Sequence, residues 1–131
     1  MTAKRILLVD DEPDALEFLQ DVLEDHGYQT VTATSATQGL SLAREHCPDL
    51  VCLDVLMPEE TGMSLFQKLR LDPVLQHVPI IITSGLSLTR DLEQIQYRNL
   101  PDGTILDGPE GVVEKPIEVE TLLRTIARVL P

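Results

Sequence analysis

The sequence predicts an α/β fold in which helices cover both faces of a parallel sheet. Short apolar runs recur along the 131-residue chain and end in polar residues, most clearly at residues 50–54, where four apolar residues lead directly into Asp54. Unbroken runs of this kind suit strands that are buried on both faces. Stretches with apolar residues at helical spacing lie between the runs and are joined by short turns. This alternation is typical of a doubly wound sheet.

The first half of the chain contains clear signals for the ends of helices. Pro13 suits the first turn of a helix, and Gly27 suits the stop after it. Ser35 is a plausible N-cap, because its hydroxyl can accept a hydrogen bond from a free amide of the first turn. Pro48 ends the second helix. These signals predict strands at residues 5–9, 28–33 and 50–54 and helices at about 13–26 and 36–46.

The second half predicts the same alternation, interrupted by one long irregular stretch. Thr61 resembles an N-cap, and Asp72-Pro73 ends the helix that follows. Residues 100–111 hold two prolines and three glycines, which indicates a loop, and within it residues 104–106 could form a short strand or an apolar anchor. The predicted strands are 79–83 and about 112–113, and the predicted helices are about 61–71, 89–99 and 118–130. The apolar stripe of the last helix is Val119, Leu122, Leu123, Ile126, Ala127 and Leu130.

Composition limits the class of protein. A hydrophobic content of 43% in 131 residues indicates one globular domain, and a net charge of −12 argues against direct contact with nucleic acid. No apolar stretch has membrane-spanning length, and the apolar run near the N-terminus is too short for a signal peptide. We therefore expect a cytoplasmic protein without membrane association. The remaining expectations are free thiols at Cys47 and Cys52 and surface positions for His26, His46 and His77.

Polar residues follow four of the predicted strands, namely Asp10-Asp11, Asp54, Ser84-Gly85 and Lys115-Pro116. The carboxyl ends of parallel strands meet at one edge of a sheet, where open α/β folds place their sites. Three carboxylates at one edge repel each other, and a hard divalent cation such as Mg²⁺ relieves that repulsion. Taken singly, each residue has a simpler interpretation, as helix N-terminal charge for Asp10-Asp11, as turn residues for Asp54 and Ser84, or as a surface lysine.

Together these motifs resemble the receiver domain of bacterial two-component response regulators. The resemblance is carried, in order along the whole chain, by Leu7-Leu8-Val9-Asp10-Asp11-Glu12-Pro13, Asp54-Val55-Leu56-Met57-Pro58 with Gly62, Ser84-Gly85 and Lys115-Pro116. It implies a flavodoxin-like fold with five parallel strands in the order 2-1-3-4-5 and five helices. The chain would then be one receiver domain over residues 1–131, with an atypical extended segment at about 86–111.

The resemblance also implies a chemistry. Asp54 would accept a phosphoryl group from a sensor histidine kinase or a phosphotransfer protein, in a phosphoacceptor that catalyses its own phosphoryl transfer and dephosphorylation without being a turnover enzyme. Ser84 and Lys115 would hold phosphoryl oxygens, and the Lys115–Pro116 peptide bond would be cis. The implied Mg²⁺ ligands are Asp10, Asp11, Asp54 and the backbone carbonyl of Leu56. Leu56 would also hinder water and slow the loss of the phosphoryl group.

Two departures from the family pattern leave alternatives open. Val112 stands where the family has a switch aromatic, three residues before the lysine, and thirty residues separate Ser84 from Lys115. We expect the 86–114 face to bind an output domain or a second copy. The first alternative function is a pseudo-receiver that acts as a phosphorylation-independent interaction module. The second, a phosphatase of the haloacid dehalogenase type, is disfavoured because the first strand does not end in Asp-x-Asp.

Overall fold

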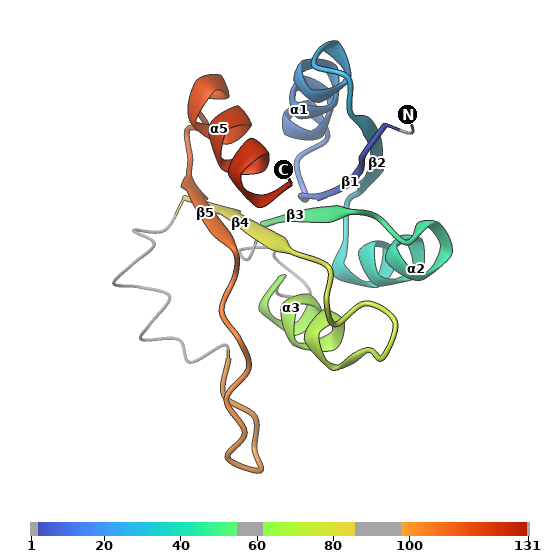
Figure 1. The fold of residues 1–131 in the computed structure, drawn as a ribbon, viewed down its shortest axis with the longest axis vertical. Helices are drawn as coiled ribbons and strands as arrows, with labels where there is room; N and C mark the ends of the chain where they lie inside the picture. The colour runs from blue at the N-terminus through green and yellow to red at the C-terminus, as the bar shows by residue number, and fades with distance from the viewer. Residues whose placement is uncertain (1–2, 55–61, 86–97, 131) are drawn as a thin grey trace.

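The fold is a five-stranded parallel sheet covered by helices on both faces. The structure, a computed structural model, describes residues 3–54, 62–85 and 98–130. The strand order β2-β1-β3-β4-β5 confirms the predicted topology (Figure 1). The strands are β1 (Arg5–Val9), β2 (Gln29–Ala33), β3 (Leu50–Asp54), β4 (Ile80–Ser84) and β5 (Gly111–Glu114).

The helices form the outer layers. Helices α1 and α5 lie on one face of the sheet, and α2 and α3 lie on the other (Figure 1). Their bounds are α1 (Pro13–Asp25), α2 (Ala36–His46), α3 (Gly62–Leu71) and α5 (Val119–Val129). The part of the chain described here thus contains four of the five expected helices. Most of the one expected at 89–99 falls outside it, and the predicted end is wrong, since residue 98 is in a turn and residue 99 in a β-bridge.

The core consists of two clusters separated by the sheet. Successive residues of a strand point to opposite faces, so Leu7 packs with α2 and α3 while Leu8 packs with α1 and α5. All five residues of β3 are buried. Of the stripe predicted for α5, Leu122 and Ile126 are fully buried. Ala127 is exposed, which corrects that prediction. Adjacent residues of a helix lie about 100° apart, so Ala127 falls beyond the buried face that Leu122 and Ile126 define.

Local hydrogen bonds explain where the helices begin and end. The hydroxyl of Ser35 accepts the amide of Gln38 at 3.1 Å, which confirms the predicted N-cap. Gly27 follows α1 with φ of +88°, a conformation that favours glycine. After α3, Asp72 Oδ1 accepts the amides of Val74 and Leu75, and these bonds fix the turn toward β4. The expected N-cap Thr61 lies outside the described residues.

Cysteines and histidines follow the expectations. Cys47 is exposed, Cys52 is buried, and both are free thiols. His26 and His77 are exposed, and His46 is partly exposed at the end of α2, where its backbone carbonyl accepts a hydrogen bond from Arg5. Within the described residues, no helix is both long and apolar enough to cross a membrane.

Residues 98–106 form a β-hairpin that projects past α3 (Figure 1). Asn99 and Ile105 pair as an antiparallel bridge, and the turn between them contains Gly103 with φ of +91°. Leu106 is buried whereas Ile105 is 67% exposed, so Leu106 alone serves as the apolar anchor. The predicted loop therefore has regular structure.

Candidate functional site

Two buried carboxylates mark the carboxyl edge of the sheet. Asp10 follows β1 directly, and Asp54 is the last residue of β3, the strand that pairs with β1. Asp10 is 2% exposed and Asp54 is 4% exposed. The amide of Asp10 donates to the carbonyl of Ala33 at 3.1 Å, which extends the β1–β2 pairing and fixes the backbone of Asp10. Two buried carboxylates at the ends of adjacent strands require a compensating cation, because their negative charges repel each other.

Lys115 supplies a positive charge to both carboxylates. It follows β5, and its Nζ lies 2.7 Å from Asp10 Oδ2 and 3.1 Å from Asp54 Oδ2. Burial lowers the pKa of Lys115, but its hydrogen bonds to Asp10 and Asp54 and their charges outweigh that effect and raise the pKa above the ordinary 10.5. The Lys115–Pro116 peptide bond is cis, as the family resemblance implied. The structure thus brings together three predicted site residues that are up to 105 positions apart.

A cluster of carboxylates adjoins this ion pair. One oxygen from each of Asp10, Asp11 and Glu12 lies within 4.8 Å of the others. The amide of Glu12 also donates to Asp10 Oδ1 at 3.0 Å. Anionic oxygen donors in such a group suit a hard divalent cation. The sequence analysis includes Glu12 in the motif that carries the family resemblance but not among the expected ligands, although its place directly after two aspartates was the available signal.

Comparison with known proteins identifies the family. The response regulator receiver domain family matches this chain over residues 6–127. The chain belongs to that family.

Its relatives share nearly their whole length with this receiver domain. The polar-differentiation response regulator DivK of Brucella ovis is 32% identical over 123 residues, which are 94% of this chain and 93% of DivK. The chemotaxis response regulator CheY4 of Vibrio cholerae superposes with a TM-score of 0.83 at 27% identity, covering 98% of this chain and 100% of CheY4. The signal receiver domain of a Syntrophus aciditrophicus histidine kinase superposes with a TM-score of 0.81 at 31% identity, covering 98% of this chain and 90% of that domain's chain. These likenesses confirm the predicted fold class.

The remaining predicted positions are placed in part. Leu56 lies outside the described residues, so its role stays a prediction. Ser84 ends β4 opposite Glu114 of β5, which puts its backbone at the same edge as Asp54, and its side chain is outside the described part. A Cβ built on Gly85 would meet no atom of the described residues within 4 Å. Val112 of this receiver domain is 41% exposed on β5.

Proposed function

We propose that this receiver domain accepts a phosphoryl group on Asp54 from a sensor histidine kinase or a phosphotransfer protein. The observation that carries the proposal is the buried ion pair in which Lys115 contacts both Asp54 and Asp10. A carboxylate at the end of the central strand, with a cation already beside it, suits the transfer of a dianionic group. The same arrangement supports a role as a signalling module over residues 1–131.

The transfer would proceed in line at phosphorus. An oxygen of Asp54 would form the new O–P bond as the N–P bond of a phosphohistidine breaks, and the electron pair of that bond would stay on the histidine nitrogen. Lys115 would hold a phosphoryl oxygen as a compact point charge. The hydroxyl of Ser84 would donate to another phosphoryl oxygen. Leu56 would hinder a hydrolytic water, so we expect slow loss of the group.

The donor set fits a bound Mg²⁺. Asp10, Asp11, Asp54 and the backbone carbonyl of Leu56 would hold the ion, and the carboxylates near it offer the oxygen ligands that Mg²⁺ prefers. When bound, the ion would offset the charge that accumulates between the carboxylates and the incoming phosphoryl group. Asp10 would bind both the ion and Lys115, because one of its oxygens already accepts a hydrogen bond from Lys115 Nζ.

Phosphorylation would change a distant face. The new dianion would attract Ser84, and the segment that follows β4 would shift with it. The 86–114 face would then bind an output domain or a second copy of the chain. We place this switch in the cytoplasm, with no direct contact to nucleic acid.

Phosphorylation by acetyl phosphate in the presence of Mg²⁺, followed by intact mass, tests the proposal. We expect a gain of one phosphoryl group that Asp54→Asn abolishes. Asp21→Asn is the matched control, because Asp21 is an exposed aspartate on α1, and it should leave the gain unchanged. Labelling that survives in Asp54→Asn would refute the assignment.

One observation favours a second function, a phosphorylation-independent interaction module. Val112 replaces the aromatic side chain that the family uses as a switch, and it is exposed rather than turned into the fold. If acetyl phosphate adds no mass and Mg²⁺ does not bind, this second function is the better account. A mass gain without any change in partner affinity would support it in part, since the site would then be active but uncoupled.

A further inference from the structure

The hairpin of residues 98–106 is held in one conformation by its own hydrogen bonds. The amide of Leu100 donates to Thr104 O at 2.8 Å, and that of Gly103 donates to Leu100 O at 3.0 Å. Asp102 Oδ1 accepts the amide of Thr104 at 2.9 Å, and this bond lowers the pKa of Asp102 below its ordinary value. A short hairpin alone is only marginally stable in water. These three hydrogen bonds therefore fix the backbone at the tip of the hairpin.

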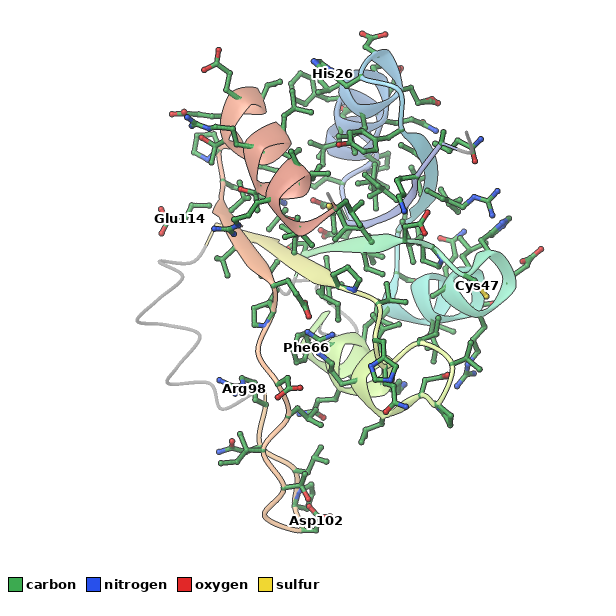
Figure 2. All side chains as sticks on the ribbon, in the orientation of Figure 1. His26, Cys47, Phe66, Arg98, Asp102 and Glu114 are labelled. Carbon is green, nitrogen blue, oxygen red and sulfur yellow. The ribbon has the colours of Figure 1, made fainter. Side chains whose placement is uncertain are left out.

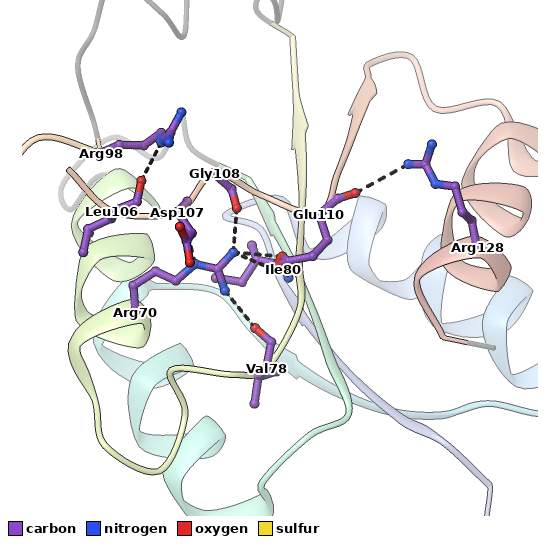
Figure 3. A network of polar contacts seen from close by, with 9 residues as sticks. All are labelled: Arg70, Val78, Ile80, Arg98, Leu106, Asp107, Gly108, Glu110 and Arg128. Carbon is purple, nitrogen blue, oxygen red and sulfur yellow. Dashed lines mark hydrogen bonds and ion pairs between the residues drawn. The ribbon is translucent and has the colours of Figure 1, made fainter.

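One arginine braces the stem of the hairpin, and a second holds the segment that follows it against the body of the domain (Figure 3). Arg98 Nε donates to Leu106 O at 2.7 Å across the stem. Arg70, on α3, donates to Gly108 O at 2.8 Å and to Val78 O at 3.1 Å, and pairs with both carboxylate oxygens of Glu110 at 2.7 and 2.8 Å. The Arg70 side chain is only 6% exposed. Arg70 therefore holds the segment directly after the hairpin against α3, between Val78, which lies ahead of β4, and Glu110, which lies ahead of β5.

The hairpin presents one large apolar side chain to solvent, and acidic side chains lie near it. Ile105 is exposed, whereas its neighbour Leu106 faces the interior. Asp102 and Asp107 are both exposed, and Asp102 lies at the far end of the hairpin (Figure 2). Arg98, the one cation of residues 98–107, is half-buried and engaged at Leu106. The exposed charges of the hairpin are thus all negative.

We propose that the hairpin is a docking element for a partner protein whose surface offers an apolar hollow rimmed by lysines and arginines. Ile105 would fill the hollow, and Asp102 and Asp107 would meet the basic rim. A β-branched side chain has few rotamers to lose, and an ordered hairpin loses little backbone entropy, so both lower the cost of binding. Acidic residues beside the apolar contact would orient the partner and speed its association. Unlike the phosphorylation-dependent binding proposed above for the 86–114 face as a whole, this docking needs only the hairpin and does not depend on phosphorylation of Asp54.

A second copy of the chain is a poorer partner for the hairpin than a basic protein. The whole chain carries a net charge of −12, so a second copy would bring mainly negative charge to an acidic hairpin. Charge complementarity therefore favours a basic partner of different sequence. The test must separate contact at the hairpin from general attraction of cations to an acidic surface.

The probe is a synthetic helical peptide with leucines along one face and arginines along both borders of that face. Four leucines on such a face leave a hollow that can receive one aliphatic side chain. Titration of the ¹⁵N-labelled full chain, followed by amide shifts, should give saturable changes centred on residues 101–107. Ile105→Asp should weaken binding at least tenfold, and Ile105→Val should weaken it less than threefold. Asp102→Asn, which keeps the acceptor for Thr104, should weaken binding severalfold and reduce its salt dependence.

Phe18→Asp is the matched control, because Phe18 is an exposed large apolar residue on α1, on the sheet face opposite α3. It should leave peptide affinity unchanged. Thermal unfolding should show that Ile105→Asp is as stable as the parent chain, since that side chain is mostly exposed. Equal affinity in Ile105→Asp and the parent, an equal loss in Phe18→Asp, shifts spread over other acidic surfaces, or no binding would each overturn the proposal.

Discussion

Removing the Arg70 guanidinium should destabilise this domain far more than removing an exposed arginine. In Arg70→Met the apolar stem is retained, while the bonds to Val78 O, to Gly108 O and to the carboxylate of Glu110 are lost. The favourable position of the guanidinium over the Phe66 ring, 5.1 Å from its centroid, is lost as well.

The expected cost is roughly 3 kcal/mol. Breaking a buried ion pair costs about 3–5 kcal/mol, and the lower end applies because water can reach Glu110, whose side chain is 37% exposed. For a chain of this length that cost corresponds to a melting temperature lower by about 10 °C. Urea unfolding followed by circular dichroism measures this loss of stability. An unchanged slope of the unfolding free energy against urea concentration would show that the folded state stays compact.

Arg44→Met is the matched control. Arg44 pairs with Asp72 at 3.0 Å, but its side chain is 60% exposed, so the loss should be about 0.5 kcal/mol or less. If Arg70→Met costs no more than Arg44→Met, the anchoring of the segment after the hairpin by Arg70 contributes nothing to stability and the reasoning fails.

Three further outcomes follow from local chemistry. Burial raises the pKa of Cys52 to about 12, so iodoacetamide at pH 8 should modify only Cys47 in the folded protein. After unfolding, both thiols should react. Modification of both thiols in the folded protein would contradict this prediction. Ser35→Ala should cost about 1 kcal/mol in urea unfolding through loss of the N-cap, and an unchanged midpoint would contradict it. The Val74 amide and a nearby guanidinium lower the pKa of Asp72 below 3.8, so its contribution to stability is complete above the unfolded pKa and is lost as the pH falls through the folded value. A ¹³C titration of the Asp72 carboxyl with a midpoint at or above 3.8 would exclude that contribution.

The parts of this fold that depend on local patterns could be predicted from the sequence. The apolar run at 50–54 indicates a strand buried on both faces, and β3 is buried at every position. The N-cap at Ser35 and the stop at Gly27 depend on bonds within a few residues, so the local sequence was enough. Convergence of Asp10, Asp54 and Lys115 could also be predicted, because parallel strands bring their carboxyl ends to one edge.

The hairpin could not be predicted in the same way. Prolines and glycines in residues 100–111 correctly indicate tight turns, and Pro101-Asp102-Gly103 suits a hairpin turn. The position of the hairpin also depends on Arg70, which donates to Gly108, 38 positions later in the chain. Glu12 was missed as a neighbour of the site for a different reason, because a carboxylate beside a helix start has a simpler explanation. A long-range partner therefore decides only the case of the hairpin.

The position of β3 affects how the family can vary. Asp54 ends a strand that pairs on both sides and is buried at every position, so its carboxylate is attached to an enclosed backbone. Substitutions on the outward faces of the helices can therefore accumulate over generations without displacing that carboxylate. Surfaces such as the hairpin can therefore change in sequence without moving the carboxylates and the lysine at the sheet edge.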